Sequence, residues 1–220
     1  MVRTLGVVGV ALALMLGACD RSSASSKAKP QPGSSSNGDD PAREQARFDA
    51  ARKPEKVVEA LKIGPGSRVA DVGAGSGLLT VHLARAVKPG GKVIATDIDG
   101  GVLEVLQQRL EAAGLTDVVE RRVVDADSSG LEDGQYDAIL LAEVDHLFDD
   151  EAGWLRNATK ALKPGGRIVI SNRIHHRDSA MAAAAKAGLT LEQESTPVPT
   201  HFIASFVLTP GASTGTGKGR

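Results

Sequence analysis

The chain has 220 residues, of which 41% are hydrophobic and 24% are charged. This balance is typical of a globular protein and excludes a wholly disordered chain. The 26 Lys and Arg residues against 27 Asp and Glu leave a formal net charge of -1, and only 3% of the residues are aromatic. Because nucleic-acid binding calls for a basic excess and base stacking calls for aromatic side chains, we expect no nucleic-acid partner.

The amino terminus has the pattern of an exported protein. Arg3 precedes an apolar run at residues 5–16, which is short for a membrane span and typical of a signal-peptide core. The Leu-Gly-Ala-Cys sequence that ends at Cys19 resembles the bacterial lipoprotein signal, in which the cysteine becomes the lipidated N-terminus. This resemblance implies a signal peptide at residues 1–18 and a lipid anchor in the bacterial cell envelope, facing the periplasm. The alternative is an uncleaved N-terminal anchor with an incidental cysteine.

Polar segments flank the part of the chain that is expected to fold. Residues 19–40 consist largely of Ser, Lys, Gly, Pro and Asn, so they bury too little surface to fold and are predicted to form a flexible, disordered tether. Residues 211–220 have a similar composition and are predicted to be a disordered tail. Residues 41–210 are therefore expected to form one domain.

Hydrophobic periodicity and the positions of Gly and Pro predict alternating helices and strands between these segments. In chain order we expect helices at residues 42–51 and 55–61, a strand at 68–72, a helix at 78–87, a strand at 92–96, a helix at 102–113, strands at 118–124 and 136–142, a helix at 151–162, a strand at 167–171, a helix at 179–187, and strands at 189–194 and 201–208. The two Lys-Pro-Gly-Gly sequences, at residues 88–91 and 163–166, are expected to be turns.

Strands that alternate with helices predict a doubly wound α/β fold, in which helices cover both faces of a mainly parallel sheet. The last two strands lack a helix between them, and residues 195–200 with two prolines connect them. We therefore expect an antiparallel hairpin at one edge of the sheet.

A glycine-rich loop follows the first predicted strand. The sequence Gly-Ala-Gly-Ser-Gly at residues 73–77 leads into a helix, so its backbone N–H groups can face a ligand that approaches the main chain closely. The dinucleotide fingerprint G-x-G-x-x-G requires glycine where this chain has Leu78, which counts against an NAD-dependent dehydrogenase. Asp71 precedes the loop and suits a ligand with a cationic end better than a pyrophosphate.

Two further acids follow the next two predicted strands. Asp97 comes at the end of the second strand, where a carboxylate can accept hydrogen bonds from both hydroxyls of a ribose. Asp125 ends the third strand, where it could accept a hydrogen bond from an exocyclic amine such as adenine N6. The alternative for each is a helix cap or a solvated acid in a turn, and Asp99 is expected to cap the helix that follows it. Because the carboxyl ends of parallel strands meet in one crevice, the acids and the loop together predict an adenosyl-ligand site.

These motifs resemble the class I S-adenosylmethionine-dependent methyltransferases over residues 52–208, and most of all the ubiquinone/menaquinone-biosynthesis-like group and its exported relatives. The resemblance is carried by Arg-Lys-Pro at residues 52–54 and by the segments 69–77, 96–99, 125–126, 136–141 and 162–170. It implies a Rossmann-like sheet of seven strands with an antiparallel last strand. It also implies that S-adenosylmethionine is the cofactor.

The resemblance further implies a cofactor site, whose residues are Asp71, Gly73, Ala74, Gly75, Gly77, Asp97, Ile98, Asp125 and Ala126. In this site the glycine loop would surround the methionine moiety, Asp97 would bind the ribose, and Ile98 would pack on the adenine. Asp125 and the backbone of Ala126 would contact the adenine edge. Asp71 would lie near the methionine ammonium group or brace the loop.

The candidates for a catalytic base follow the fourth strand, whose end faces the reactive methyl group in this family. Methyl transfer is an in-line displacement with a good leaving group, so a base is required only where the acceptor must lose a proton. His146 and Glu143 are the candidate catalytic residues, with Asp145 beside them; Glu143 could instead make a backbone contact, and His146 could brace the loop. His175 and His176 lie near the expected acceptor pocket, but without further ligands at useful spacing they predict no metal site.

Little of the chain is available to build an acceptor site. Residues 172–178 form a short connection, and the helix that follows is nearly all alanine over residues 181–187. The acceptor site is therefore expected to be open and suited to a large partner, or degenerate. We predict a membrane-tethered methyltransferase that acts on a small or lipid-soluble acceptor. The alternative is a lipoprotein that binds an adenosyl ligand without transferring a methyl group, because S-adenosylmethionine supply outside the cytoplasm is not assured.

Overall fold

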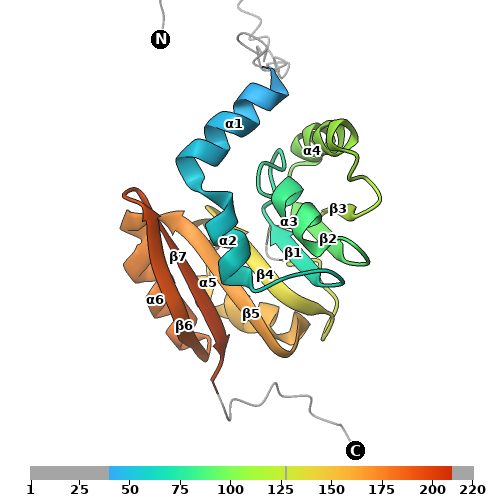
Figure 1. Cartoon of the computed structure of the whole chain (residues 1–220). Helices are drawn as coiled ribbons and strands as arrows, with labels where there is room; N and C mark the ends of the chain where they lie inside the picture. The colour runs from blue at the N-terminus through green and yellow to red at the C-terminus, as the bar shows by residue number, and fades with distance from the viewer. Residues whose placement is uncertain (1–39, 127, 210–220) are drawn as a thin grey trace, which may run out of the picture. The chain divides into compact units, whose positions relative to one another are not determined.

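A seven-stranded sheet forms the centre of the computed structural model, which describes residues 40–126 and 128–209 (Figure 1). Its strands are β1 (Arg68–Val72), β2 (Lys92–Asp97), β3 (Val119–Val123), β4 (Tyr136–Ala142), β5 (Leu162–Arg173), β6 (Leu189–Val198) and β7 (His201–Leu208). They lie in the order β3-β2-β1-β4-β5-β7-β6, and β7 runs antiparallel to both of its neighbours. The predicted doubly wound, mainly parallel sheet with an antiparallel last strand is therefore confirmed. The predicted signal peptide, Cys19, residues 19–39 of the tether and the tail lie outside the described residues.

Helices cover both faces of this sheet (Figure 1). They are α1 (Pro41–Arg52), α2 (Pro54–Leu61), α3 (Thr80–Val87), α4 (Gly100–Ala113), α5 (Glu151–Ala158) and α6 (Arg177–Lys186). The apolar sides of α2, α3 and α4 pack with alternate strand residues such as Leu140 and Val169 into one core. Those of α5 and α6 pack with the intervening residues, such as Ile139 and Ile170, into a second core on the opposite face. The alternation along each central strand thus divides its side chains between two hydrophobic layers.

Local signals set the ends of several helices. The Asp40 carboxylate accepts a hydrogen bond from the backbone N–H of Ala42 at the start of α1, and Asp99 accepts one from Gly101 at 2.7 Å at the start of α4. Such N-caps satisfy backbone donors that lack a partner within the helix. Gly114, at a φ of 64°, ends α4 in the left-handed conformation that favours glycine. The expected cap at Asp99 is confirmed.

The largest differences between the structure and the sequence prediction lie at the ends of three elements. Residues 163–166, expected to be a turn, belong to β5, where the pairing with β4 skips between Tyr136 and Ala138 so that the chain bulges without leaving the sheet. The helix predicted at residues 151–162 ends at Ala158 and continues as a 3₁₀ turn over Thr159–Ala161. Strand β6 extends to Val198 and so includes four residues that were expected in the connector, 195–198. One of them is Pro197, which an edge strand tolerates because its outer N–H groups need no partner.

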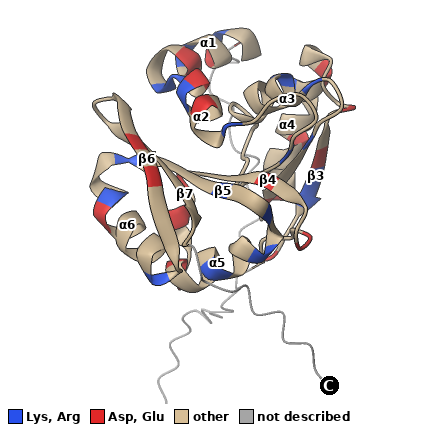
Figure 2. Cartoon of the chain, turned by 60° about the horizontal axis from the view of Figure 1, so that its bottom comes forward, with Lys and Arg blue, Asp and Glu red and all other residues tan. Residues whose placement is uncertain are grey.

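Acidic and basic residues are interspersed along α1 and α6 (Figure 2). This mixture agrees with the near-zero net charge of the chain. Among the helices in residues 40–126 and 128–209, none combines the length and the apolar character needed to cross a bilayer.

Candidate functional site

The glycine loop lies between β1 and α3 and is docked on the end of β2. The backbone N–H groups of Gly73 and Ala74 donate to the carbonyl oxygen of Thr96 at 2.8 and 3.0 Å. Gly77 has a φ of 84°, and a Cβ at this position would lie 2.0 Å from Cδ1 of Leu106 on α4. Both the backbone conformation and the close approach of α4 therefore require glycine at position 77.

Asp71 lies beneath the loop and is 1% exposed. The Thr80 hydroxyl, at the start of α3, donates to its carboxylate at 2.7 Å. Burial raises the pKa of Asp71 to about 6; the nearby charge of Asp97 adds to the rise, while the Thr80 hydrogen bond opposes it. Because this contact ties β1 to α3 across the loop, the structure supports bracing, the second of the two roles expected for Asp71. The contact with a methionine ammonium group stays a prediction.

Asp97 holds the loop from the other side. One of its carboxylate oxygens accepts a hydrogen bond from the backbone N–H of Gly75 at 2.9 Å, and the other accepts one from Asp99 at 3.0 Å. An ionised carboxylate has about four acceptor positions, so each oxygen retains capacity for one further donor. The geometry is compatible with two ribose hydroxyls, and this role stays a prediction.

A cleft of about 300 Å³ opens beside Asp97. Its lining includes the predicted cofactor residues Asp97, Ile98, Asp125 and Ala126 together with apolar Val144, Leu147 and Phe148. The Ile98 side chain is exposed, with 65% of the residue accessible, so it offers an apolar surface at the cleft. Carboxylate acceptors next to apolar walls suit the hydroxyls, exocyclic amine and flat ring of an adenosine.

A second cleft, of about 230 Å³, lies on the other side of the glycine loop. Its lining includes Asp71, Gly73, Ala74 and Gly75, and also Phe48 and Arg52 from α1. Gly73 and Glu143 line both clefts. Eight of the nine predicted cofactor residues therefore line one cleft or the other, and the ninth, Gly77, packs against α4 behind the loop.

Helix α1 forms a polar wall over the loop. Arg109 of α4 donates to the carbonyl oxygen of Ser76 at 2.8 Å and forms an ion pair with Glu44 of α1 at 2.6 Å. Gln45 donates from its side-chain amide to the carbonyl oxygen of Leu78 at 3.0 Å. Helix α1 contributes no buried residue of its own, so hydrogen bonds and ion pairs, together with the partly buried Phe48, dock it on the domain.

Glu143, a candidate catalytic residue, stands at the end of β4 with a φ of 56°, a conformation that costs free energy in a residue other than glycine. Its carboxylate forms ion pairs with Arg52 and, at 3.6 Å, with Arg173, and it lies 3.2 Å from Nε2 of His201. Burial alone would raise the pKa of Glu143, but the charges of Arg52, His201 and Arg173 lower it below its ordinary value. Glu143 is therefore an ionised group at the junction of the clefts.

Sequence reasoning assigned no role to the three partners of Glu143. Arg52 belongs to the Arg-Lys-Pro sequence that carried part of the resemblance, which was the available signal. Arg173 and His201 face each other as partners in the antiparallel pairing of β5 with β7. They are far apart in the chain, and no local pattern connects them.

His146, the other candidate catalytic residue, is exposed and is not among the lining residues of either cleft. Its Nδ1 lies 3.0 Å from the side-chain nitrogen of Asn172, which also donates to the buried Asp145 at 2.7 Å. The imidazole stacks on that of His176, with the ring centroids 4.1 Å apart. These contacts fit the alternative of a bracing role, and catalysis by His146 stays a prediction. Within the described ranges, no three His, Cys, Asp or Glu side chains are grouped to hold a metal ion.

The sheet order, the glycine loop and the acids at the ends of β1 and β2 are those of the Rossmann-like fold found in methyltransferases. Residues 70–168 match the family described as "Methyltransferase domain". Over 118 residues the chain is 33% identical to the ubiquinone/menaquinone biosynthesis C-methyltransferases UbiE of Ectopseudomonas mendocina and Pseudomonas putida, a match that covers 52% of this chain and 44% of theirs. The chain thus spans less than half the length of these curated relatives.

Solved structures show the same fold. A SAM-dependent methyltransferase from Aquifex aeolicus superposes with a TM-score of 0.68 at 21% identity, covering 78% of this chain and 95% of that one. Geranyl diphosphate C-methyltransferase from Streptomyces coelicolor superposes with a TM-score of 0.62 at 16% identity, covering 76% and 82%. The chain therefore has the fold of S-adenosylmethionine-dependent methyltransferases, and its residues 70–168 match the methyltransferase-domain family.

Proposed function

We propose that this protein transfers the methyl group of S-adenosylmethionine to a small or lipid-soluble acceptor while anchored to a bacterial membrane through Cys19. The observation that carries the catalytic part is the pair of clefts on either side of the glycine loop. They bring eight of the nine expected cofactor residues together, and they meet at Gly73 and Glu143.

S-adenosylmethionine supplies a methyl group on a positively charged sulfur. In the transfer, the bond between sulfur and the methyl carbon breaks while a bond between that carbon and the acceptor forms. S-adenosylhomocysteine leaves, and any proton that the acceptor loses passes to a base or to solvent. The residues of this chain bind and orient. Asp97 holds the ribose, Asp125 contacts the adenine edge, and Ile98 covers the ring. Since the leaving group is already good, holding the two reactants in line supplies most of the acceleration.

The acceptor class rests on likeness to relatives. The matched proteins are named as C-methyltransferases of ubiquinone and menaquinone biosynthesis. That name favours a lipid-soluble acceptor for this chain as well. Attachment to a membrane would bring the enzyme to such an acceptor.

The anchor rests on the N-terminal sequence, which lies outside the described residues. Arg3, the apolar run at residues 5–16 and Cys19 support lipidation of that cysteine. The variant Cys19→Ser cannot be acylated at this position, so we expect it in the soluble fraction after cell lysis. If it sediments with membranes as the parent protein does, the lipid anchor is refuted.

Calorimetric titration with S-adenosylmethionine and S-adenosylhomocysteine tests the cofactor site, with Cys19→Ser as the soluble form of the full chain. We expect both ligands to bind with micromolar affinity. Turnover is then tested with S-adenosylmethionine labelled in the methyl group and a membrane-lipid extract of the source cells. Label in the extract that depends on Asp97 supports catalysis, whereas binding without transfer would indicate a non-catalytic adenosyl-binding protein.

A further inference from the structure

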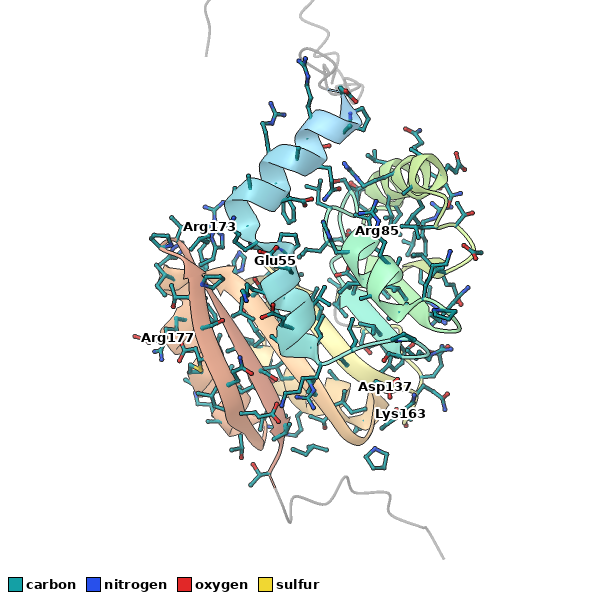
Figure 3. The ribbon with its side chains drawn as sticks, in the orientation of Figure 1. Glu55, Arg85, Asp137, Lys163, Arg173 and Arg177 are labelled. Carbon is teal, nitrogen blue, oxygen red and sulfur yellow. The ribbon has the colours of Figure 1, made fainter. Side chains whose placement is uncertain are left out.

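Four side chains from four elements meet at Glu143, which lines both clefts. Glu143 follows β4, Arg52 ends α1, Arg173 ends β5 and His201 begins β7. We call these residues the Glu143 cluster. In Figure 3, Arg173 lies beside the junction of α1 and α2, on the side of the sheet edge formed by β6 and β7.

The Glu143 cluster carries more positive than negative charge. Two guanidinium groups, which stay charged in proteins, face one carboxylate. Burial lowers the pKa of His201, and the charge of Arg52 lowers it further, while Glu143 opposes both effects. The lowered pKa of His201 favours its neutral form, so the excess of positive charge in the cluster comes from the two guanidinium groups. In the described part of the chain, neither arginine has a second carboxylate at ion-pair distance.

Arg52 and Arg173 also have hydrogen-bond donors beyond those that contact Glu143. Each guanidinium has five N–H groups in a planar fork that matches a carboxylate or a phosphate. Arg52 uses Nη1 on Glu143, whereas the Arg173 atom paired with Glu143 is Nε, at 3.6 Å, so the two terminal nitrogens of Arg173 are not the paired atoms. The Arg173 side chain is 61% exposed, so these nitrogens are open to a ligand.

The backbone at Glu143 gives an independent indication of function. A residue other than glycine at a φ of 56° costs about 1–3 kcal/mol, and such conformations concentrate at ligand sites, where surrounding contacts maintain them. Here the surrounding contacts are a backbone hydrogen bond from Glu143 N–H to the carbonyl oxygen of Ser171 at 2.9 Å and the side-chain contacts of the Glu143 cluster. The strained residue is also one of the two that line both clefts.

We propose, building on the proposed function, that the Glu143 cluster binds an anionic group of the methyl acceptor, a carboxylate or a phosphate, chiefly through Arg173. Arg173 and His201 are not among the residues lining either cofactor cleft. They lie on the far side of Glu143 from the glycine loop, toward β7. An acceptor whose anionic group binds Arg173 would therefore lie next to Glu143, where the two clefts meet.

The test measures anion binding directly and does not require knowledge of the acceptor. Benzoate, phenyl phosphate and the neutral benzamide are titrated into Cys19→Ser protein, with and without saturating S-adenosylhomocysteine. We expect one of the anions to bind at least about tenfold more tightly than benzamide, the scale of one charged hydrogen bond. Comparing the affinities of benzoate and phenyl phosphate shows whether the Glu143 cluster prefers a carboxylate or a phosphate group.

Three variants locate the binding. Arg173→Gln should lose about tenfold in anion affinity, and Arg173→Lys should recover part of it because the charge returns without the fork. Arg177→Gln is the matched control, since Arg177 begins α6 and pairs with Glu194 and Asp178 outside the Glu143 cluster (Figure 3). It should bind the anions as the parent does, and all three variants should bind S-adenosylhomocysteine within about twofold of the parent.

The outcomes separate this inference from the proposed function. Equal binding of anions and benzamide, or unchanged anion binding by Arg173→Gln, refutes the acceptor site and leaves the cofactor site standing. Anions that bind only in the absence of S-adenosylhomocysteine also refute it, because they would then occupy the position of the cofactor's own carboxylate. Failure of S-adenosylhomocysteine to bind refutes the proposed function instead, and the anion titrations of the ligand-free protein still report on Arg173.

Discussion

Replacing Asp97 by alanine removes a carboxylate that performs two tasks in the structure. It accepts hydrogen bonds from the backbone N–H groups of Gly75 and Asp99, at 2.9 and 3.0 Å, and it lines the larger cleft. The first task positions the glycine loop, and the second offers acceptors to a ribose. The substitution therefore affects both the protein and its affinity for the cofactor.

The expected loss of affinity follows from the bonds that disappear. A hydrogen bond to a charged acceptor contributes about 1.5–3 kcal/mol, so losing the ribose contact raises the Kd for S-adenosylhomocysteine by roughly 10- to 150-fold. Loss of the Gly75 contact adds to this figure, because the freed loop must be ordered again on binding. Asp97 is partly exposed, and water can replace part of what the backbone donors lose, so the free energy of unfolding should fall by only about 1–2 kcal/mol.

Calorimetric titration and urea unfolding measure the two effects separately. Asp99→Ala is the control, because Asp99 caps α4 two residues away and is not among the lining residues of the cleft. It should lower stability by about 1 kcal/mol while the Kd stays at the parent value. A parent-like Kd for Asp97→Ala would remove Asp97 from the ribose site, and an equal loss of affinity in Asp99→Ala would show that general loosening of the loop explains the effect.

Two further predictions concern stability. Gly77→Ala should lower the free energy of unfolding by about 2–4 kcal/mol, because a methyl group at a φ of 84° would lie 2.0 Å from Leu106. If the midpoint of urea unfolding is unchanged in this variant, the packing argument is refuted. Burial raises the pKa of Glu151 to about 7 from its ordinary 4.5, and the charge of Asp145 adds to the rise, so the folded state holds this proton more tightly than the unfolded chain does. The stability that the Glu151 carboxyl contributes is therefore fully present below pH 4.5 and is lost as the pH rises to about 7. In Glu151→Gln, unfolding free energies measured up to about pH 8 should lack this part of the pH dependence. An unchanged pH profile would assign the dependence to other groups.

Most of the fold could be predicted from local patterns. The bounds expected for the strands Arg68–Val72, Tyr136–Ala142 and His201–Leu208 agree with those in the structure, because alternating or continuous apolar runs between Gly and Pro breaks are properties of neighbouring residues. The residues that line the two clefts beside the glycine loop were also within reach of the sequence. Strands of a parallel sheet bring their carboxyl ends to one edge, so a loop and acids at successive strand ends must converge there.

The boundary errors have a tertiary cause. A Lys-Pro-Gly-Gly sequence predicts a turn at residues 163–166, yet its backbone remains in β5 because β4 pairs with the chain before and after it. Proline likewise predicts a break in the last connector, but β6 is an edge strand and needs no donor on its outer side. In both places the neighbouring strand outweighs the local preference.

The sequence by itself determined the class of fold, the glycine loop and the acids that line the two clefts. Only the tertiary structure decided which residues surround Glu143. Arg52 precedes it by 91 positions and His201 follows it by 58, and Arg173 meets His201 because β7 inserts between β5 and β6. Hydrophobic periodicity reports the local conformation of residues that are close together in the sequence. Contacts between distant residues depend instead on strand order and register, which the packing of the whole sheet selects.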